Sequence, residues 1–186
     1  MVLTDREIQA AIENKQIVID PAPAIEAYSS TSLDLTLSGR LSAWKTPKVG
    51  GVEETTVSPA ASGYNFHTFQ KEYSEPKEIG DEGFILLPGL FILGWTEEYI
   101  HLPESSRVAA RVEGKSSLAR LGIGIHITAP TIHAGFDGPI QLEICNHGPL
   151  RVRLLKGMRV CQLIFEQTLG TPAKGYAGQF QKQKKQ

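Results

Sequence analysis

Short stretches in which apolar and polar residues alternate recur along this chain and set its fold class. The clearest are residues 33–37, 107–113, 140–144 and 158–166, and turn-forming glycine, proline or asparagine residues lie between them. A period of two places the apolar side chains on one face of a β-strand. Many such strands with little sign of helix are typical of a sandwich or barrel. We therefore predict an all-β fold with short helices, built as a distorted β-barrel or jelly roll.

One helix is expected at the N-terminus. Thr4 and Glu7 have the spacing of a capping box, and Leu3 and Ile8 fit the hydrophobic staple that accompanies it. The pattern predicts a helix over residues 5–14.

The middle of the chain divides into two parts. Residues 46–79 are rich in Gly, Pro, Ser, Thr and Glu. This composition predicts a long excursion with one or two short strands, and we expect His67 to be a solvated loop histidine. Residues 83–103 then read as two strands hinged at Pro88 and Gly89.

Composition narrows the class of protein further. A chain of 186 residues with 41% hydrophobic and 21% charged residues fits one soluble globular domain, residues 1–186. The net charge of −1 does not favour nucleic acid or an anionic membrane as a partner, and no apolar run reaches the length of a membrane span. The first residues lack a signal-peptide pattern, so we expect a cytoplasmic protein.

The two cysteines do not form a metal-binding motif. Cys145 and Cys161 are too few and too far apart for a CxxC pair, and we expect both to be reduced core residues. Zinc-dependent nucleobase deaminases carry His-x-Glu and Pro-Cys-x-x-Cys motifs, which this sequence lacks. The sequence therefore lacks the zinc site with which that class of enzyme activates water.

A cationic, hydroxyl-rich turn at Lys115, Ser116 and Ser117 is a candidate anion site. The turn opens a short segment in which Leu118 and Leu121 are spaced to bury one side while Arg120 points elsewhere. Unpaired N–H groups at the start of a helix favour a phosphate or carboxylate, and these side chains add further donors.

Glu143 places a carboxylate in the middle of an apolar strand. In the stretch PIQLEIC, Ile140, Leu142 and Ile144 alternate with more polar neighbours. A buried carboxylate is costly unless paired, and Arg120 is the nearest cation in sequence. Glu143 is therefore either half of a structural ion pair or, beside an anion-binding turn, a proton carrier in a functional site.

Three stretches resemble the dCTP deaminase and dUTPase superfamily. They are GKSSLAR, TAPTIHAGFDGPIQLE and GMRVCQLIF, within a similarity that spans roughly residues 29–179, and the glutamate of QLE resembles the deaminase branch. The resemblance implies a dUTPase-type fold, in which Asp34 is structural and residues 83–103 form a hairpin. It also implies hydrolytic deamination of dCTP to dUTP and ammonia without zinc, in pyrimidine deoxynucleotide synthesis.

The resemblance also assigns site residues. Glu143 would be the general base and acid, helped by Ser116 and Arg120. The residues implied to bind phosphates, sugar or base are Lys115, Ser116, Ser117, Leu118, Ala119, Arg120, Ala129, His133, Gln141, Leu142, Gln162, Lys174, Tyr176 and Gln179. Mg²⁺ is expected only as the counterion of the triphosphate. The resemblance further implies a homotrimer with sites shared between chains, and residues 170–186 as a flexible lid.

His133 leaves alternatives open. Related enzymes usually hold an acidic residue at the matching position, and in the pyrophosphatases an aspartate there orients the attacking water. A histidine offers no permanent anion, so we predict weak or absent dUTP hydrolysis. The alternatives are a dUTP pyrophosphatase, a bifunctional enzyme that converts dCTP to dUMP, and a nucleotide sensor that binds without turnover.

Overall fold

The computed structural model describes residues 1–45 and 56–173 of the 186-residue chain. The helices are α1 (Asp5–Glu13), α2 (Phe66–Tyr73) and α3 (Ser116–Ala119), with two 3-10 turns, η1 (Ile25–Ala27) and η2 (Glu104–Ser106). The strands are β1 (Val18–Asp20), β2 (Tyr28–Ser29), β3 (Ser32–Trp44), β4 (Ser74–Glu78), β5 (Phe84–Leu86), β6 (Phe91–His101), β7 (Val108–Gly114), β8 (Ile123–Gly124), β9 (Thr131–Ile132), β10 (Asp137–Asn146), β11 (Val152–Leu154) and β12 (Arg159–Gln167).

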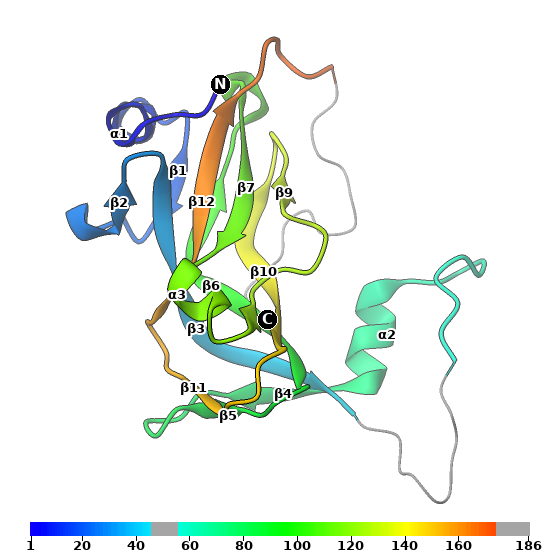
Figure 1. The fold of residues 1–186 in the computed structure, drawn as a ribbon. Coiled ribbons are helices and arrows are strands. Elements are labelled where there is room, and N and C mark those ends of the chain that lie inside the picture. The colour runs from blue at the N-terminus through cyan, green and yellow to red at the C-terminus, as the bar shows by residue number, and fades with distance from the viewer. Residues whose placement is uncertain (46–55, 174–186) are drawn as a thin grey trace, which may run out of the picture.

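Within those residues, ten strands form one curled antiparallel sheet (Figure 1). The strand order is β8-β10-β6-β3-β12-β7-β9, with β1 added on β6 and with β2 and β4 added on β3. A smaller sheet pairs β5 with β11. The prediction of a mainly β fold with short helices is therefore confirmed.

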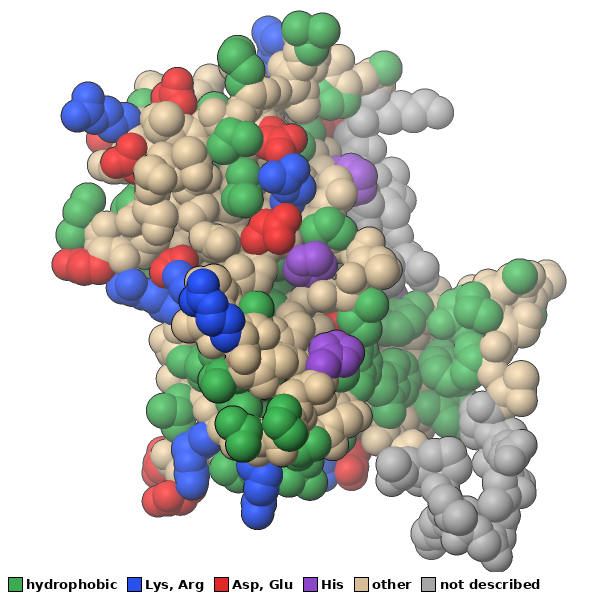
Figure 2. All heavy atoms as spheres, in the orientation of Figure 1, with side chains coloured by type: hydrophobic (Ala, Val, Ile, Leu, Met, Phe, Trp, Pro, Cys, Tyr) green, Lys and Arg blue, Asp and Glu red, His purple; other side chains and the backbone are tan. Residues whose placement is uncertain are grey.

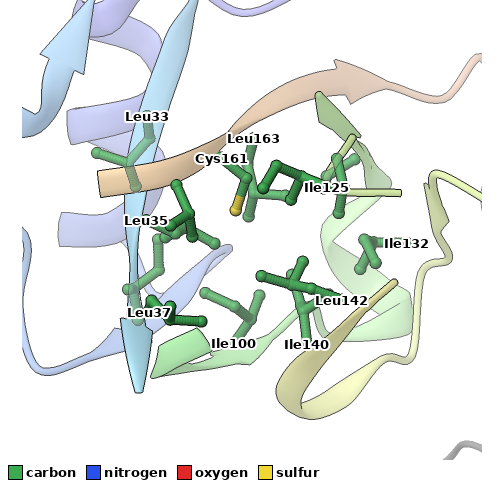
Figure 3. Close-up of a cluster of buried hydrophobic side chains, with 14 of the residues drawn as sticks. Leu33, Leu35, Leu37, Ile100, Ile125, Ile132, Ile140, Leu142, Cys161 and Leu163 are labelled. Carbon is green, nitrogen blue, oxygen red and sulfur yellow. The ribbon is translucent and has the colours of Figure 1, made fainter. Parts of the chain in front are cut away.

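The core fills the inside of the curl. Apolar side chains from β3, β6, β10 and β12 are almost completely buried there, and α1 adds Ile8 at one side. Side chains alternate along each strand, so every second one points into the curl. Register shifts of the β-bulge kind interrupt the pairing of β10 with β6, of β12 with β3 and of β3 with β6, and such irregularities bend a strand. Figure 3 shows the convergence for Leu33, Leu35, Leu37, Ile100, Ile125, Ile132, Ile140, Leu142, Cys161 and Leu163.

The N-terminal helix forms as the sequence indicates. In α1 the capping box of Thr4 and Glu7 is present, and the Thr4 N–H donates to Glu7 Oε2 over 2.8 Å. None of the helices in the described part of the chain is long and apolar enough to cross a bilayer.

Two details of the middle segment differ from the prediction. The excursion contains a helix, α2, so His67 lies on a helix and not in a loop. Residues 83–103 do form two strands, but β5 pairs with β11 while β6 pairs with β1, β3 and β10. The expected hairpin is therefore wrong. At Pro88 and Gly89 the chain passes from the small sheet to the large one. The strands that pair with β5 and β6 lie far away in sequence, so the sequence pattern of residues 83–103 does not reveal them.

The cysteines are free within the described residues. Cys161 is buried in the core as predicted, whereas Cys145 is only partly buried. Neither forms a disulfide there.

Asp34 introduces a charge into the middle of β3. It is 7% exposed, and both of its carboxylate oxygens lie 2.5 Å from Lys115 Nζ. Arg159 Nη1 on β12 lies 3.8 Å from the same carboxylate. The buried charge thereby ties the turn after β7 and the start of β12 to the central strand, which agrees with the structural role expected for Asp34.

Gln162 reinforces this connection. Its Oε1 accepts a hydrogen bond of 2.7 Å from Ser32 Oγ, and its Nε2 donates to the Gly114 carbonyl over 3.3 Å. The amide thus bridges β3 and the end of β7, on either side of β12.

We predict that Lys115→Met destabilises the protein by about 3 kcal/mol. Removing one partner leaves a buried charge uncompensated, which typically costs about 3 to 5 kcal/mol, and Arg159 offsets part of that cost. Lys77→Met is the matched control, since its ion pair with Glu75 is solvent-exposed at 42% and 50% and should change stability by less than about 0.5 kcal/mol. Urea unfolding at fixed protein concentration measures both, and equal stabilities would contradict a structural role for the Asp34–Lys115 pair.

Candidate active site

A pocket of about 550 Å³ lies beside the middle of β10. Five of the residues assigned by sequence line it: Ala129, His133, Gln141, Leu142 and Glu143. Residues 141–143 come from β10, whereas Ala129 and His133 come from the segment between β8 and β10. Folding thus gathers in one chain the residues assigned to the base and the sugar.

Glu143 is the acidic group of this pocket. Its neighbours Leu142 and Ile144 point into the core, so strand alternation turns the carboxylate to the opposite face, where it is half-buried. The Ile127 N–H donates to Glu143 Oε2 over 3.4 Å. Burial raises the pKa of Glu143 above that of an exposed glutamate, and the Ile127 hydrogen bond and the charge of His126 oppose this rise. A carboxyl whose pKa is raised by burial and lowered by nearby polar groups is suited both to take up and to release a proton.

The predicted pairing of Arg120 with Glu143 does not form within the chain. Arg120 is exposed at the end of α3 and takes part in no ion pair with the other described residues. The side chain whose charge contributes to lowering the pKa of Glu143 is instead His126, and the Nε2 of His126 also lies 3.9 Å from Glu113 Oε2.

The turn at α3 lies outside the pocket of the same chain. Ser116, Ser117, Ala119 and Arg120 are exposed and line no part of it. Leu118 is buried as expected, but Leu121 is 41% exposed, so the expectation that both leucines are buried is wrong. The helix ends at Ala119, which leaves Leu121 beyond the turn that packs on the core.

Lys115 is engaged elsewhere. Its ammonium is held by Asp34, and it lines no part of the pocket. Gln162 is likewise held by Ser32 and Gly114 and does not reach the pocket. Lys174, Tyr176 and Gln179 lie outside the described residues.

Several lining residues were not identified from sequence. His126 lies three residues before Ala129, which the resemblance had assigned to the site, but no sequence motif links His126 to Glu143. Trp44 at the end of β3 and Phe66 at the start of α2 also line the pocket. Trp44 lies just before the excursion of residues 46–79 and Phe66 lies within it, and only the path of the folded chain brings both rings to the pocket of Glu143.

No metal-binding cluster is evident in the part of the chain that the structure describes. There, no group of three or more His, Cys, Asp or Glu side chains could hold an ion. The polar side chains that line this pocket include a carboxyl, an amide, a hydroxyl and two imidazoles, contributed by Glu143, Gln141, Thr131, His126 and His133.

Comparison with solved structures supports the fold. The chain superimposes on the crystal structure of a 2′-deoxycytidine 5′-triphosphate deaminase from Agrobacterium tumefaciens with a TM-score of 0.67 at 21% identity. The match covers 88% of this chain, which spans about half, 47%, of the length of that protein.

Sequence comparison gives closer relatives. A protein of Methanobrevibacter smithii named "dCTP deaminase, dUMP-forming" is 36% identical over 176 residues, which cover 92% of this chain and 82% of that protein. A protein of Rhodospirillum rubrum named "dCTP deaminase" is 37% identical over 180 residues, covering 95% and 88%. Residues 2–168 match the dCTP deaminase-like family across the whole described β fold, and the chain belongs to that family.

Proposed function

We propose that this protein hydrolyses dCTP to dUTP and ammonia, with Glu143 carrying the protons and without zinc. The observation that carries the proposal is the half-buried Glu143 carboxyl, with its raised pKa, in the pocket of a chain that belongs to the dCTP deaminase-like family. The names of the relatives from M. smithii and R. rubrum support dCTP as the substrate.

The reaction needs one group that acts first as a base and then as an acid. Glu143 takes a proton from water as the oxygen attacks C4 of cytosine, and passes that proton to the ring nitrogen N3. Glu143 then takes the remaining proton from the new C4 hydroxyl and transfers it to the amino group, so that the C4–N bond breaks, ammonia leaves and the C4 carbonyl of uracil forms. A pKa nearer neutrality than that of an exposed glutamate suits both steps. The Ile127 N–H donates to one carboxylate oxygen, Oε2, and so helps to orient the carboxyl.

The triphosphate requires cations that one chain does not place in its pocket. The residues lining the pocket include no lysine or arginine among those described. Arg120 and Ser116 are exposed on α3, outside the pocket of their own chain. The resemblance implies a homotrimer with shared sites, and we therefore infer that α3 of a neighbouring copy supplies Ser116 and Arg120. Sedimentation gives the mass directly, and a monomer would rule out shared sites.

Two further elements of the proposal concern the substrate. Mg²⁺ enters as the counterion of the triphosphate, held by phosphate oxygens and water. The chain beyond residue 170 acts as a lid that closes over the bound nucleotide, as the resemblance implies.

The first test replaces the proposed proton carrier. Glu143→Gln keeps the shape of the side chain and removes its ability to carry a proton, so kcat for ammonia release should fall by ~10² to 10⁴ while dCTP binding persists. Glu166→Gln on β12 is the matched control, because this carboxylate pairs with Arg111 outside the pocket. A loss of less than about tenfold in the Glu143 variant would assign that residue a structural role.

The pH profile provides a second test. Water is activated by the ionised form of Glu143, so kcat should fall as the pH drops through its pKa. Because burial raises that pKa, the acidic limb should lie above the usual range of an exposed glutamate. His126→Gln removes a charge that lowers the pKa and should move the limb to still higher pH. If the acidic limb of the pH profile does not move in His126→Gln, the electrostatic effect of His126 on Glu143 is contradicted.

A bifunctional enzyme is the second candidate. It is favoured by the M. smithii relative, which is named as dUMP-forming. His133 lines the pocket of this chain, at the position where the resemblance implies an acidic residue.

We expect dUTP to be a poor substrate for the wild-type protein, because a neutral histidine accepts a hydrogen bond but supplies no permanent anion to orient water. His133→Asp should increase dUMP formation from dUTP. Counting ammonia, pyrophosphate and dUMP from separate dCTP and dUTP incubations decides the matter. Efficient wild-type conversion of dUTP to dUMP would replace the first candidate by the second, and tight binding without any product would identify a nucleotide sensor.

A further inference from the structure

Part of the pocket wall is aromatic and comes from segments far from Glu143 in sequence. Trp44 is the last residue of β3 and Phe66 is the first residue of α2, and both line the pocket that holds Gln141 and Glu143. Twenty-one residues separate the two rings along the chain, whereas in space their centroids lie 6.3 Å apart with an angle of 77° between the ring planes. This edge-to-face pair is a preferred aromatic geometry.

The position of Phe66 is held from both ends of α2. At its start, the Asn65 side chain accepts a hydrogen bond of 3.0 Å from the Thr68 N–H. At its end, the Lys45 N–H donates to the Tyr73 carbonyl over 2.9 Å, and Ser42 Oγ lies 2.8 Å from Ser74 Oγ. The C-terminal end of α2 is thereby fixed to β3.

A second set of ring contacts runs along the helix. Phe69 lies 5.7 Å from the Trp44 ring and stacks on Tyr73 at 4.5 Å. The helix therefore presents Phe66 to the pocket on a supported frame, which reduces the conformational entropy that ligand binding would cost.

These rings are not part of the core. No residue of α2 is buried, and Phe66 remains partly exposed where it meets the pocket. Figure 2 shows hydrophobic side chains gathered over α2 and next to the body of the protein. A partly exposed aromatic surface at the edge of a polar pocket is suited to cover a flat heterocycle.

We propose that Trp44 and Phe66 form an aromatic wall that takes the face of the pyrimidine ring while Gln141 and Glu143 meet its polar edge. The proposal rests on the proposed function for the identity of the nucleotide. Base stacking on an aromatic side chain contributes affinity for any pyrimidine, because every base has a π face. The wall therefore selects nucleotides over bare polyphosphate, and the polar residues distinguish one base from another.

Fluorescence of Trp44 tests the contact without requiring turnover. The chain has two tryptophans, and the other, Trp95, lies outside the pocket with the Arg40 guanidinium 5.4 Å from its ring centre. In Trp95→Phe, Trp44 is the sole tryptophan. Its emission should be quenched by dCTP and by dUTP in a saturable manner and should not respond to tripolyphosphate. Unchanged emission at dCTP concentrations that saturate binding in a direct binding assay, or an equal response to tripolyphosphate, would overturn the proposal.

Kinetics of Phe66→Leu provide the second test. Leucine keeps an apolar side chain but removes the ring, so KM for dCTP should rise by about 5- to 100-fold while kcat changes by less than about threefold. Tyr64→Leu is the matched control, because this ring contacts Phe69 at 6.2 Å but does not line the pocket. An unchanged KM in Phe66→Leu, with or without a lower unfolding midpoint, would leave the ring only a structural role.

The two proposals fail separately. If dCTP quenches Trp44 but no product forms, the aromatic wall stands and the deaminase function fails. If ammonia is released while Trp44 emission and the KM of Phe66→Leu stay unchanged, the deaminase function stands and the wall fails.

Discussion

The alternation of side chains along β10 is the constraint on which the site depends. Ile140, Leu142 and Ile144 are almost completely buried in the core, and their packing fixes which face of the strand Glu143 occupies. A slip of one residue between β10 and β6 would turn every side chain of the strand over. The hydrophobic core therefore specifies the position of the carboxylate as well as stabilising the sheet.

The environment of Glu143 is a compromise between stability and chemistry. Burial disfavours the ionised carboxylate and raises its pKa. The Ile127 N–H and the His126 charge favour the ionised form and lower the pKa in part. Complete compensation by a close arginine would give a stable ion pair and a poor proton carrier. Within the described residues Arg120 forms no ion pair with Glu143, and the contacts that Glu143 does make are weaker, which suits the proton transfers that we propose for it.

The two cations near α3, Lys115 and Arg120, have different surroundings. Lys115 neutralises the buried Asp34 and so ties the turn after β7 to the central strand. Arg120, five residues further along, is exposed and available to a ligand outside its own chain. Lys115 is thus a structural cation because its partner Asp34 is buried, whereas the exposed Arg120 is a candidate for binding a ligand.

The sequence by itself determined the strand-rich fold, the capped first helix and the placement of Glu143 on an otherwise apolar strand. Each of these follows from local periodicity or from short motifs, which neighbouring residues along the chain suffice to specify. The family resemblance added Ala129, His133, Gln141 and Leu142, and the fold places all four in one pocket with Glu143. Tertiary structure alone decided that β5 leaves β6 to pair with β11, that Lys115 binds Asp34, and that Trp44 and Phe66 reach the pocket. These contacts join residues from 22 to 81 positions apart. A local sequence pattern carries no information about such pairs, because only the folded sheet brings the segments together.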